Sequence, residues 1–222
     1  EIVKNRIENN IPKGLLGINI GPNKETSNMI NDFIACAKTF FPLGDYVTIN
    51  ISSPNTEGLR EFHDKELLEG LLLKFNKSFL LKISPDLDDS SIDHIIELSL
   101  KYDINGLILT NTTVRNRENL IDQKKNEEGG LSGKPIKDLS TNFIKNFYKR
   151  LNGKIPIIGV GGVDSGKSAF EKISAGASAV QLYTGMIYKG PLIVKEIKRD
   201  LINILKEKGF KNIKEVIGTN LN

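Results

Sequence analysis

The chain has 222 residues, of which 39% are hydrophobic, and its 31 basic and 27 acidic side chains leave a formal net charge of +4. This composition excludes a largely disordered chain, and because basic and acidic residues alternate, as in 195–200, it does not indicate a nucleic-acid-binding surface. One cysteine and two histidines offer no internal disulfide and no structural zinc site, and no apolar run reaches the roughly 20 residues that span a bilayer.

Six short apolar runs rich in β-branched residues predict buried strands, at 15–20, 46–52, 79–84, 106–111, 155–162 and 179–185. Segments with helical periodicity lie between them, at 26–39, 64–75, 90–102, 134–151 and 165–175. A last helix is expected from Pro191, with a buried face formed by Ile193, Ile197, Leu201 and Leu205. Regular alternation of strand and helix predicts an α/β protein with a parallel sheet.

Polar residues and glycines follow each predicted strand at its C-terminal end. Six such ends suit a ring around one ligand, which favours a (β/α)8 TIM barrel over an open sheet. Because such barrels need eight strands and about 250 residues, we expect about six of the eight strands here, in one domain covering 1–222. On this reading the chain is N-terminally incomplete and 1–10 is the tail of a helix. A complete open sheet with a short first helix is the alternative.

The longest polar interval, 114–130, is predicted to be a mobile loop over the site that ends in the glycine-rich turn at 129–133. A solvated insertion without a function is the alternative. Cys36 lies among apolar residues of a helix and is expected to pack there. His63 and His94 have no metal-ligand spacing and are expected at the surface.

Two segments carry polar groups suited to a small ligand. The residues after the second strand include Asn50, Ser53 and Asn55, whose amides and hydroxyl suit a planar, amide-rich heterocycle, although a plain Ser-Pro-Asn turn also explains them. Lys82 stands in an apolar strand, so if it points inward it implies an anionic ligand, and if it points outward it is solvated.

The glycine-rich segment 161–168 matches the Walker A pattern, with Lys167 as its lysine. A P-loop nucleotide hydrolase also needs a strand that ends in a magnesium-binding Asp, and no later strand does so. The same glycines can bind a phosphate at a helix N-terminus in a barrel, which is the interpretation we favour.

Six segments in order resemble class 2 dihydroorotate dehydrogenase, the quinone-linked flavoenzyme of pyrimidine synthesis. They are Asn50-Ile-Ser-Ser-Pro-Asn-Thr-Glu-Gly-Leu-Arg60, Leu81-Lys-Ile-Ser-Pro-Asp-Leu87, Thr110-Asn-Thr-Thr113, Gly129-Gly-Leu-Ser-Gly-Lys-Pro135, Ile155-Pro-Ile-Ile-Gly-Val-Gly-Gly162 and Ala175-Gly-Ala-Ser-Ala-Val-Gln-Leu-Tyr-Thr-Gly185. In this family the base position is Cys in class 1 and Ser in class 2, so Ser53 indicates class 2.

The resemblance implies that Ser53 removes the C5 proton of dihydroorotate while C6 delivers hydride to FMN, giving orotate, and that a quinone then accepts the electrons. It implies pyrimidine contacts from Asn50, Asn55, Asn111 and Thr112. It implies FMN contacts from Asn19, Asn50, Lys82, Thr110, Ser132, Gly133, Gly161, Gly162, Tyr183 and Thr184, and no metal. Because no histidine is evident beside Ser53 in the sequence, a water or threonine relay is expected to carry the proton away.

The chain also departs from the family. Members begin with a membrane-associated helical pair and two further strands, and neither is evident here. The resemblance therefore implies peripheral attachment to a bacterial cytoplasmic or mitochondrial inner membrane only through such a region, and this chain alone reads as soluble. An inactive remnant or a barrel fragment that binds a phosphate ligand without catalysis is the alternative.

Overall fold

The computed structural model describes residues 1–102, 104–115 and 117–221. Its sheet has six parallel strands in sequential order. They are β1 (Gly17–Ile20), β2 (Tyr46–Asn50), β3 (Leu80–Ile83), β4 (Gly106–Leu109), β5 (Ile157–Val160) and β6 (Ala179–Gln181). All six predicted strands are confirmed, each shorter than its apolar run.

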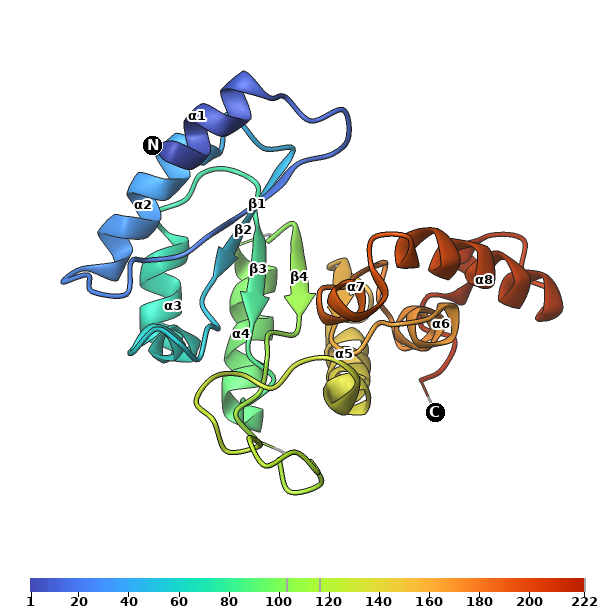
Figure 1. Cartoon of the computed structure of the whole chain (residues 1–222). Coiled ribbons are helices and arrows are strands. Elements are labelled where there is room, and N and C mark those ends of the chain that lie inside the picture. Colours follow the sequence, from blue (N-terminus) through green and yellow to red (C-terminus); the bar gives the residue numbers. More distant parts are fainter. Residues whose placement is uncertain (103, 116, 222) are drawn as a thin grey trace.

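Helices cover one face of this sheet (Figure 1). They are α2 (Met29–Phe40), α3 (Lys65–Leu72), α4 (Asp89–Lys101), α5 (Lys137–Leu151) and α6 (Gly166–Ser174), while α1 (Ile2–Asn9) precedes β1 and buries no residue. Side-chain caps fix where most of the covering helices begin. Asn28, Asp64, Asp88 and Ser165 each accept a hydrogen bond from a backbone N–H of the first turn.

The strand register decides which side chains face the helices. In β2, Val47 and Ile49 are fully buried against the helical layer, and alternation then turns Asn50 to the opposite face. Lys82 pairs with Asn50 in register and shares that face. The side chain of Lys82 therefore points inward, and the anionic ligand that this orientation implies stays a prediction.

The sheet is curled, and its inner face is concave. Gln181 on β6 donates a hydrogen bond of 3.5 Å to the hydroxyl of Tyr46 on β2, although three strands lie between them. The Tyr46 ring occupies the space where a Cβ of Gly17 would stand, so only glycine fits opposite it. A curled sheet of six parallel strands is the partial barrel that the sequence predicted, rather than a flat open sheet.

Two boundaries at the C-terminal end were wrong. The last predicted strand, 179–185, ends at Gln181, and helix α7 (Thr184–Lys189) follows, with the N–H of Ile187 donating to the carbonyl of Tyr183. Helix α8 (Ile193–Glu207) begins two residues after Pro191. Ile193 and Ile197 are buried against α6 as expected.

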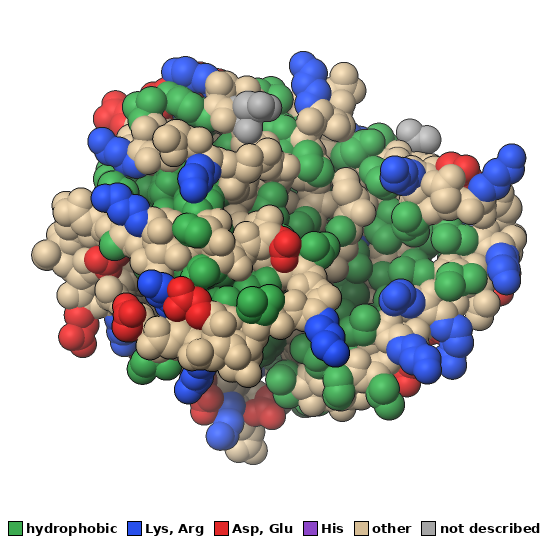
Figure 2. All heavy atoms as spheres, turned by 90° about the horizontal axis from the view of Figure 1, so that it is seen from above, with side chains coloured by type: hydrophobic (Ala, Val, Ile, Leu, Met, Phe, Trp, Pro, Cys, Tyr) green, Lys and Arg blue, Asp and Glu red, His purple; other side chains and the backbone are tan. Residues whose placement is uncertain are grey.

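Three short helical turns complete the chain, at η1 (Leu59–His63), η2 (Lys134–Ile136) and η3 (Ile213–Val216). Cys36 packs against the main core as expected. Within the described residues, no helix is both long and apolar enough to cross a bilayer. Seen from above, the molecule is hollowed between the part that holds β1 to β4 and the part that holds α6 to α8, and hydrophobic side chains gather along the hollow (Figure 2).

Candidate functional site

A cavity of about 830 Å³ lies where β3 to β6 end. Its volume is in the range of sites for organic ligands and cofactors. Ten of the residues singled out in the sequence line it: Lys82, Thr110, Asn111, Thr112, Ser132, Gly133, Gly161, Gly162, Tyr183 and Thr184. These ten residues come from five separate chain segments, which follow β3, β4, β5 and β6 or precede η2, and they converge on one space. Four of the six polar strand ends in the sequence therefore meet at this cavity.

Glycines shape one wall of this cavity. Gly161 and Gly162 have φ angles of 113° and 71°, a region that side-chain-bearing residues rarely adopt. A Cβ at Gly162 would stand 2.6 Å from the Cβ of Lys137, so the backbone packs directly on the start of α5. The loop then enters α6, and a glycine turn that leads into a helix is suited to bind a phosphate through backbone N–H groups.

Lys82 brings positive charge to the cavity. Burial lowers the pKa of its ammonium group, and among the described residues no carboxylate pairs with it. Nearby, the Oγ1 atom of Thr110 is buried and has no hydrogen-bond partner in the described part of the chain. Both groups can be satisfied by a polar, anionic ligand in the cavity.

A network of amides joins the ends of β2 and β4. Asn50 Oδ1 accepts hydrogen bonds from Ser52 N (3.2 Å), Ser52 Oγ (2.9 Å) and Asn111 Nδ2 (3.3 Å). The Oδ1 atom of Asn111 accepts from the N–H of Thr112 (2.8 Å). Because three donors fix the carbonyl of Asn50, the orientation of its NH2 group is also fixed, which suits a donor to a ligand.

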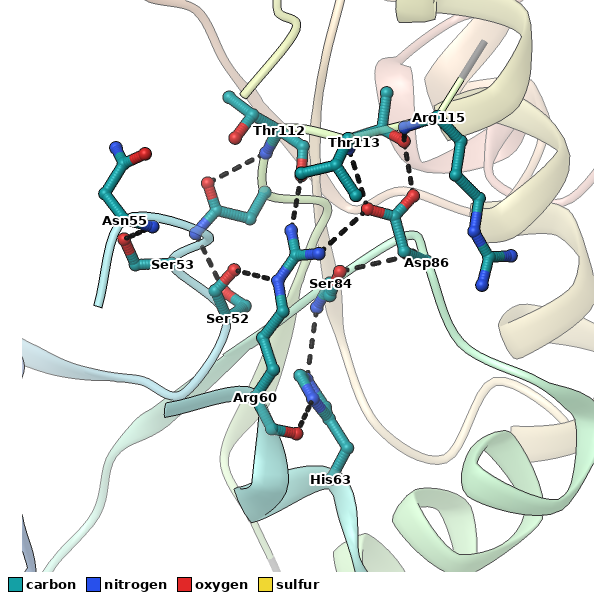
Figure 3. A network of polar contacts seen from close by, with 12 residues as sticks. Ser52, Ser53, Asn55, Arg60, His63, Ser84, Asp86, Thr112, Thr113 and Arg115 are labelled. Carbon is teal, nitrogen blue, oxygen red and sulfur yellow. Dashed lines mark hydrogen bonds and ion pairs between the residues drawn. The ribbon is translucent and has the colours of Figure 1, made fainter. Parts of the chain in front are cut away.

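Ser53 borders the cavity and does not line it. Its Oγ accepts a hydrogen bond of 3.2 Å from the N–H of Asn55, which closes a tight turn (Figure 3). This turn lies against the glycine pair 129–130, since a Cβ at Gly130 would come within 3.2 Å of Pro54 and one at Gly129 within 3.9 Å of the Asn55 Oδ1. Asn55, like Asn50, is absent from the lining residues.

Asn19 lies farther from the cavity. It stands on β1 in register with Thr48, and its side chain is exposed on the inner face of the sheet. The ligand contact expected of Asn19 stays a prediction.

The polar loop 114–130 returns to the cavity in the expected position. Thr113 and Leu131 form an antiparallel bridge at its base. The guanidinium of Arg117 donates to the carbonyls of Lys125 (3.1 Å), Glu127 (2.5 Å) and Gly129. The loop is thus folded around one side chain, and its mobility stays a prediction.

His63 corrects the expectation of a surface residue, because its exposed fraction is only 4%. Its Nδ1 lies 2.7 Å from the carbonyl of Arg60, and its Nε2 accepts from the N–H of Ser84 over 3.3 Å, which assigns the proton to Nδ1. Burial lowers the pKa of His63 to about 4, so the ring is neutral at pH 7. Both nitrogens are engaged, and His63 therefore does not serve Ser53 as a base.

Sequence reasoning missed Lys172, whose side chain is fully buried between α5 and α6. Its ammonium donates to Ser140 Oγ (3.0 Å), Thr141 Oγ1 (3.2 Å) and the carbonyl of Lys137 (3.4 Å). Ser140 in turn donates to the carbonyl of Val160, directly before the glycine turn. Burial lowers the pKa of Lys172 to about 8. The apolar periodicity of α6 gave no signal for a buried cation at this position.

Sequence reasoning also assigned no role to Arg60 and Asp86, although both belong to segments that follow strands. They form an ion pair of 3.0 Å at the site (Figure 3). The signal available in the sequence was a charged side chain in a segment that directly follows a strand.

The Walker A interpretation finds no support in the structure. Lys167 is exposed on α6 and lines a separate groove against α8. The hydroxyl of Ser168 is used in a capping box with Ser165. Neither side chain reaches the cavity, so the pattern is accidental.

The chain is similar to known proteins over almost its whole length. A family model described as dihydroorotate dehydrogenase matches residues 1–205. Relatives named dihydroorotate dehydrogenase (quinone) include the mitochondrial protein of Mus musculus, 44% identical over 91% of this chain and 54% of its own length, and that of Idiomarina loihiensis, 46% identical over 89% and 63%. A crystal structure of DHODH from Eimeria tenella in complex with ferulenol superposes with a TM-score of 0.89 at 35% identity, over 99% of this chain and 65% of that one. The chain thus spans between about half and two thirds of the length of these relatives.

Proposed function

The chain belongs to the dihydroorotate dehydrogenase family, and we propose that it carries the cofactor and substrate site of a quinone-dependent member, oxidising dihydroorotate to orotate. The observation that carries this proposal is the convergence of ten residues, from the ends of four strands and from the loop before η2, on one cavity. The names of the relatives support the quinone class, as does Ser53 at the base position.

FMN fits the cavity on three observations. The glycine turn at Gly161 and Gly162 suits its phosphate. Within 1–102, 104–115 and 117–221, the Lys82 ammonium pairs with no carboxylate and the buried Oγ1 of Thr110 has no hydrogen-bond partner, so both groups suit a polar, anionic ligand. Ser132 and Thr184, whose hydroxyls lie 2.9 Å apart, join the two loops on either side. When bound, FMN supplies a hydride acceptor. The remaining proposed contacts are Asn19, Asn50, Gly133 and Tyr183.

The residues of the chain position the pyrimidine and move its proton. We assign the ring contacts to Asn50, Asn55, Asn111 and Thr112, because amides can match both donors and acceptors of the substrate. Ser53 accepts the proton from C5, and since both nitrogens of His63 are engaged, that proton leaves through water or a threonine hydroxyl. With FMN bound, the Lys82 ammonium would stabilise the negative charge that the hydride acceptor gains.

The proposed electron acceptor and cellular location also rest on the membership of the family. Electrons pass to a quinone, and the protein works at a bacterial cytoplasmic or mitochondrial inner membrane, as the mitochondrial relatives suggest. We propose that residues 1–222 form a single FMN-binding domain.

Binding measurements separate this proposal from a remnant that holds only a phosphate ligand. Purified chain is titrated with FMN by fluorescence, and orotate is then added while the absorbance of the flavin is followed. The proposal predicts stoichiometric FMN and a perturbed flavin spectrum on adding orotate. Binding of inorganic phosphate and FMN without any response to orotate would instead support the remnant.

A further inference from the structure

We propose that Arg60 and Asp86 are a positioning pair. The pair fixes the position of the loop that carries the base, Ser53, relative to the loop that carries the substrate contacts Asn111 and Thr112. The inference rests on the proposed function, and it adds two residues that are not among those lining the cavity. Figure 3 shows the pair between the two loops.

Arg60 reaches both loops from η1. Its Nε donates to the carbonyl of Ser52 (3.3 Å), in the peptide that directly precedes Ser53. Its Nη2 donates to the carbonyl of Thr112 (3.2 Å), 52 residues away in sequence. The planar guanidinium therefore fixes the distance between the backbone next to the base and the backbone of a substrate contact.

Asp86 connects a third loop, the one after β3, to these two loops. It follows β3, and its Oδ2 accepts from Arg60 Nη1 (3.0 Å) and from the N–H of Val114 (2.9 Å), while its Oδ1 accepts from the hydroxyl of Thr113. Its own N–H donates to Ser84 Oγ (3.1 Å). The loops that follow β2, β3 and β4 are thus joined through one carboxylate and one guanidinium.

The environment keeps this pair rigid. The side chain of Asp86 is only 5% exposed and that of Arg60 26%, so solvent competes little for their contacts. The carbonyl of Arg60 is itself held by the neutral His63 ring, whose other nitrogen binds the N–H of Ser84. A surface ion pair such as Arg150 with Asp93 joins only outer helices and touches no strand-end loop.

The consequence for the reaction follows from geometry. Proton transfer to Ser53 requires its Oγ to lie within hydrogen-bond reach of the substrate carbon, which Asn111 and Thr112 position. A displacement of about 1 Å in such an arrangement can cost about 100-fold in rate. Loss of the pair therefore slows the proton-transfer step while leaving the FMN phosphate site, on β5 and β6, intact.

The test uses the full chain loaded with FMN, with variants Arg60→Met, Arg60→Lys and Asp86→Asn, and with Arg150→Met as a matched control. Anaerobic reduction of FMN by dihydroorotate gives the limiting rate and the half-saturating concentration. FMN affinity and thermal unfolding are measured in parallel, and amide hydrogen exchange is followed in 53–56 and 111–115 without ligand.

We expect a limiting rate about 100-fold lower in Arg60→Met and Asp86→Asn, FMN affinity within twofold of the parent chain, and faster exchange confined to the two loops. Arg60→Lys is expected to recover less than a tenth of the parent rate, because an ammonium cannot donate in three fixed directions. A variant that combines Arg60→Met with Asp86→Asn is expected to lose no more rate than either single variant.

Rates within threefold of the Arg150→Met control, or full recovery in Arg60→Lys, would overturn the positioning role. If either single variant unfolds, the other supplies the comparison. If the parent chain binds FMN and is not reduced by dihydroorotate, the proposed function fails, and hydrogen exchange alone then judges the pair: unchanged exchange in both loops would refute it, and faster exchange confined to them would support it.

Discussion

The Nδ2 atom of Asn111 donates a hydrogen bond of 2.9 Å to the Oγ of Ser52, across 59 residues of sequence. These residues follow β4 and β2, and β3 lies between those strands in the sheet. The contact is possible because parallel strands end at one edge and the sheet curls there. One amide therefore connects the segment of the proposed base with the segment of the proposed substrate contacts.

The glycine turn is the first feature to test by substitution. Gly162→Ala is expected to abolish measurable FMN binding and to lower the midpoint of thermal unfolding, because its Cβ would collide with Lys137 in addition to the strain of a positive φ. Gly209→Ala is the matched control, since Gly209 has a φ of 75° and open space around it. Strain alone costs about 1 kcal/mol, so equal effects of the two substitutions would refute the packing argument.

Lys82 and Lys167 distinguish the two phosphate-binding interpretations. Lys82→Met is expected to weaken FMN binding at least about tenfold, because a charge-assisted contact contributes roughly 1.5 to 3 kcal/mol. Lys167→Met is expected to leave FMN binding unchanged, as its side chain faces the groove with α8. Fluorescence titration of both variants decides the matter, and a larger loss in Lys167→Met would revive the Walker A interpretation.

The buried His63 predicts an acid-sensitive fold. The unfolded chain binds a proton near the ordinary pKa of 6.5, whereas the folded chain does so only near pH 4. The free energy of unfolding therefore falls as the pH drops from 6.5 to 4, by about 1.4 kcal/mol per pH unit. In denaturant unfolding experiments across this range, the slope of the free energy of unfolding against pH should be shallower in His63→Gln than in the parent chain. Equal slopes in the parent chain and His63→Gln would contradict the assignment.

The buried Lys172 predicts that the free energy of unfolding depends on pH in the alkaline range as well. Its folded pKa of about 8 lies below the ordinary 10.5, so between these values the unfolded chain holds a proton that the folded chain has released. Its contribution to the free energy of unfolding rises with pH over that interval, by about 1.4 kcal/mol per unit. The difference between the parent chain and Lys172→Met should grow across pH 8 to 10. A difference that stays constant across this range would contradict the lowered pKa of Lys172.

The sequence predicted the sheet well because buried parallel strands leave a direct record in apolar, β-branched runs. It extended the last strand to 185 because Leu182 and Tyr183 continue the apolar run. The structure instead starts α7 at Thr184, where a Cβ at Gly185 would lie 2.7 Å from the carbonyl of Val163. That contact comes from another loop, which local pattern does not contain.

The cavity was predictable where a lining residue lies at a strand end, as with Lys82, Asn111 and Gly162. His63 and Lys172 were not, because their burial depends on neighbours brought by other elements. Two polar hydrogen-bond partners stabilise His63, and three oxygen acceptors surround Lys172. Polar residues buried by such tertiary contacts look like surface residues in a sequence.

The most direct measurement is anaerobic mixing of the FMN-loaded chain with dihydroorotate, comparing the parent sequence with Ser53→Ala. The account predicts that the oxidised flavin absorbance of the parent chain disappears and that orotate forms in equal amount. It predicts that Ser53→Ala binds FMN equally well and is reduced at least about 100-fold more slowly, as expected for loss of a general base. Reduction of Ser53→Ala at the parental rate, or a parent chain that binds FMN and never bleaches, would contradict it.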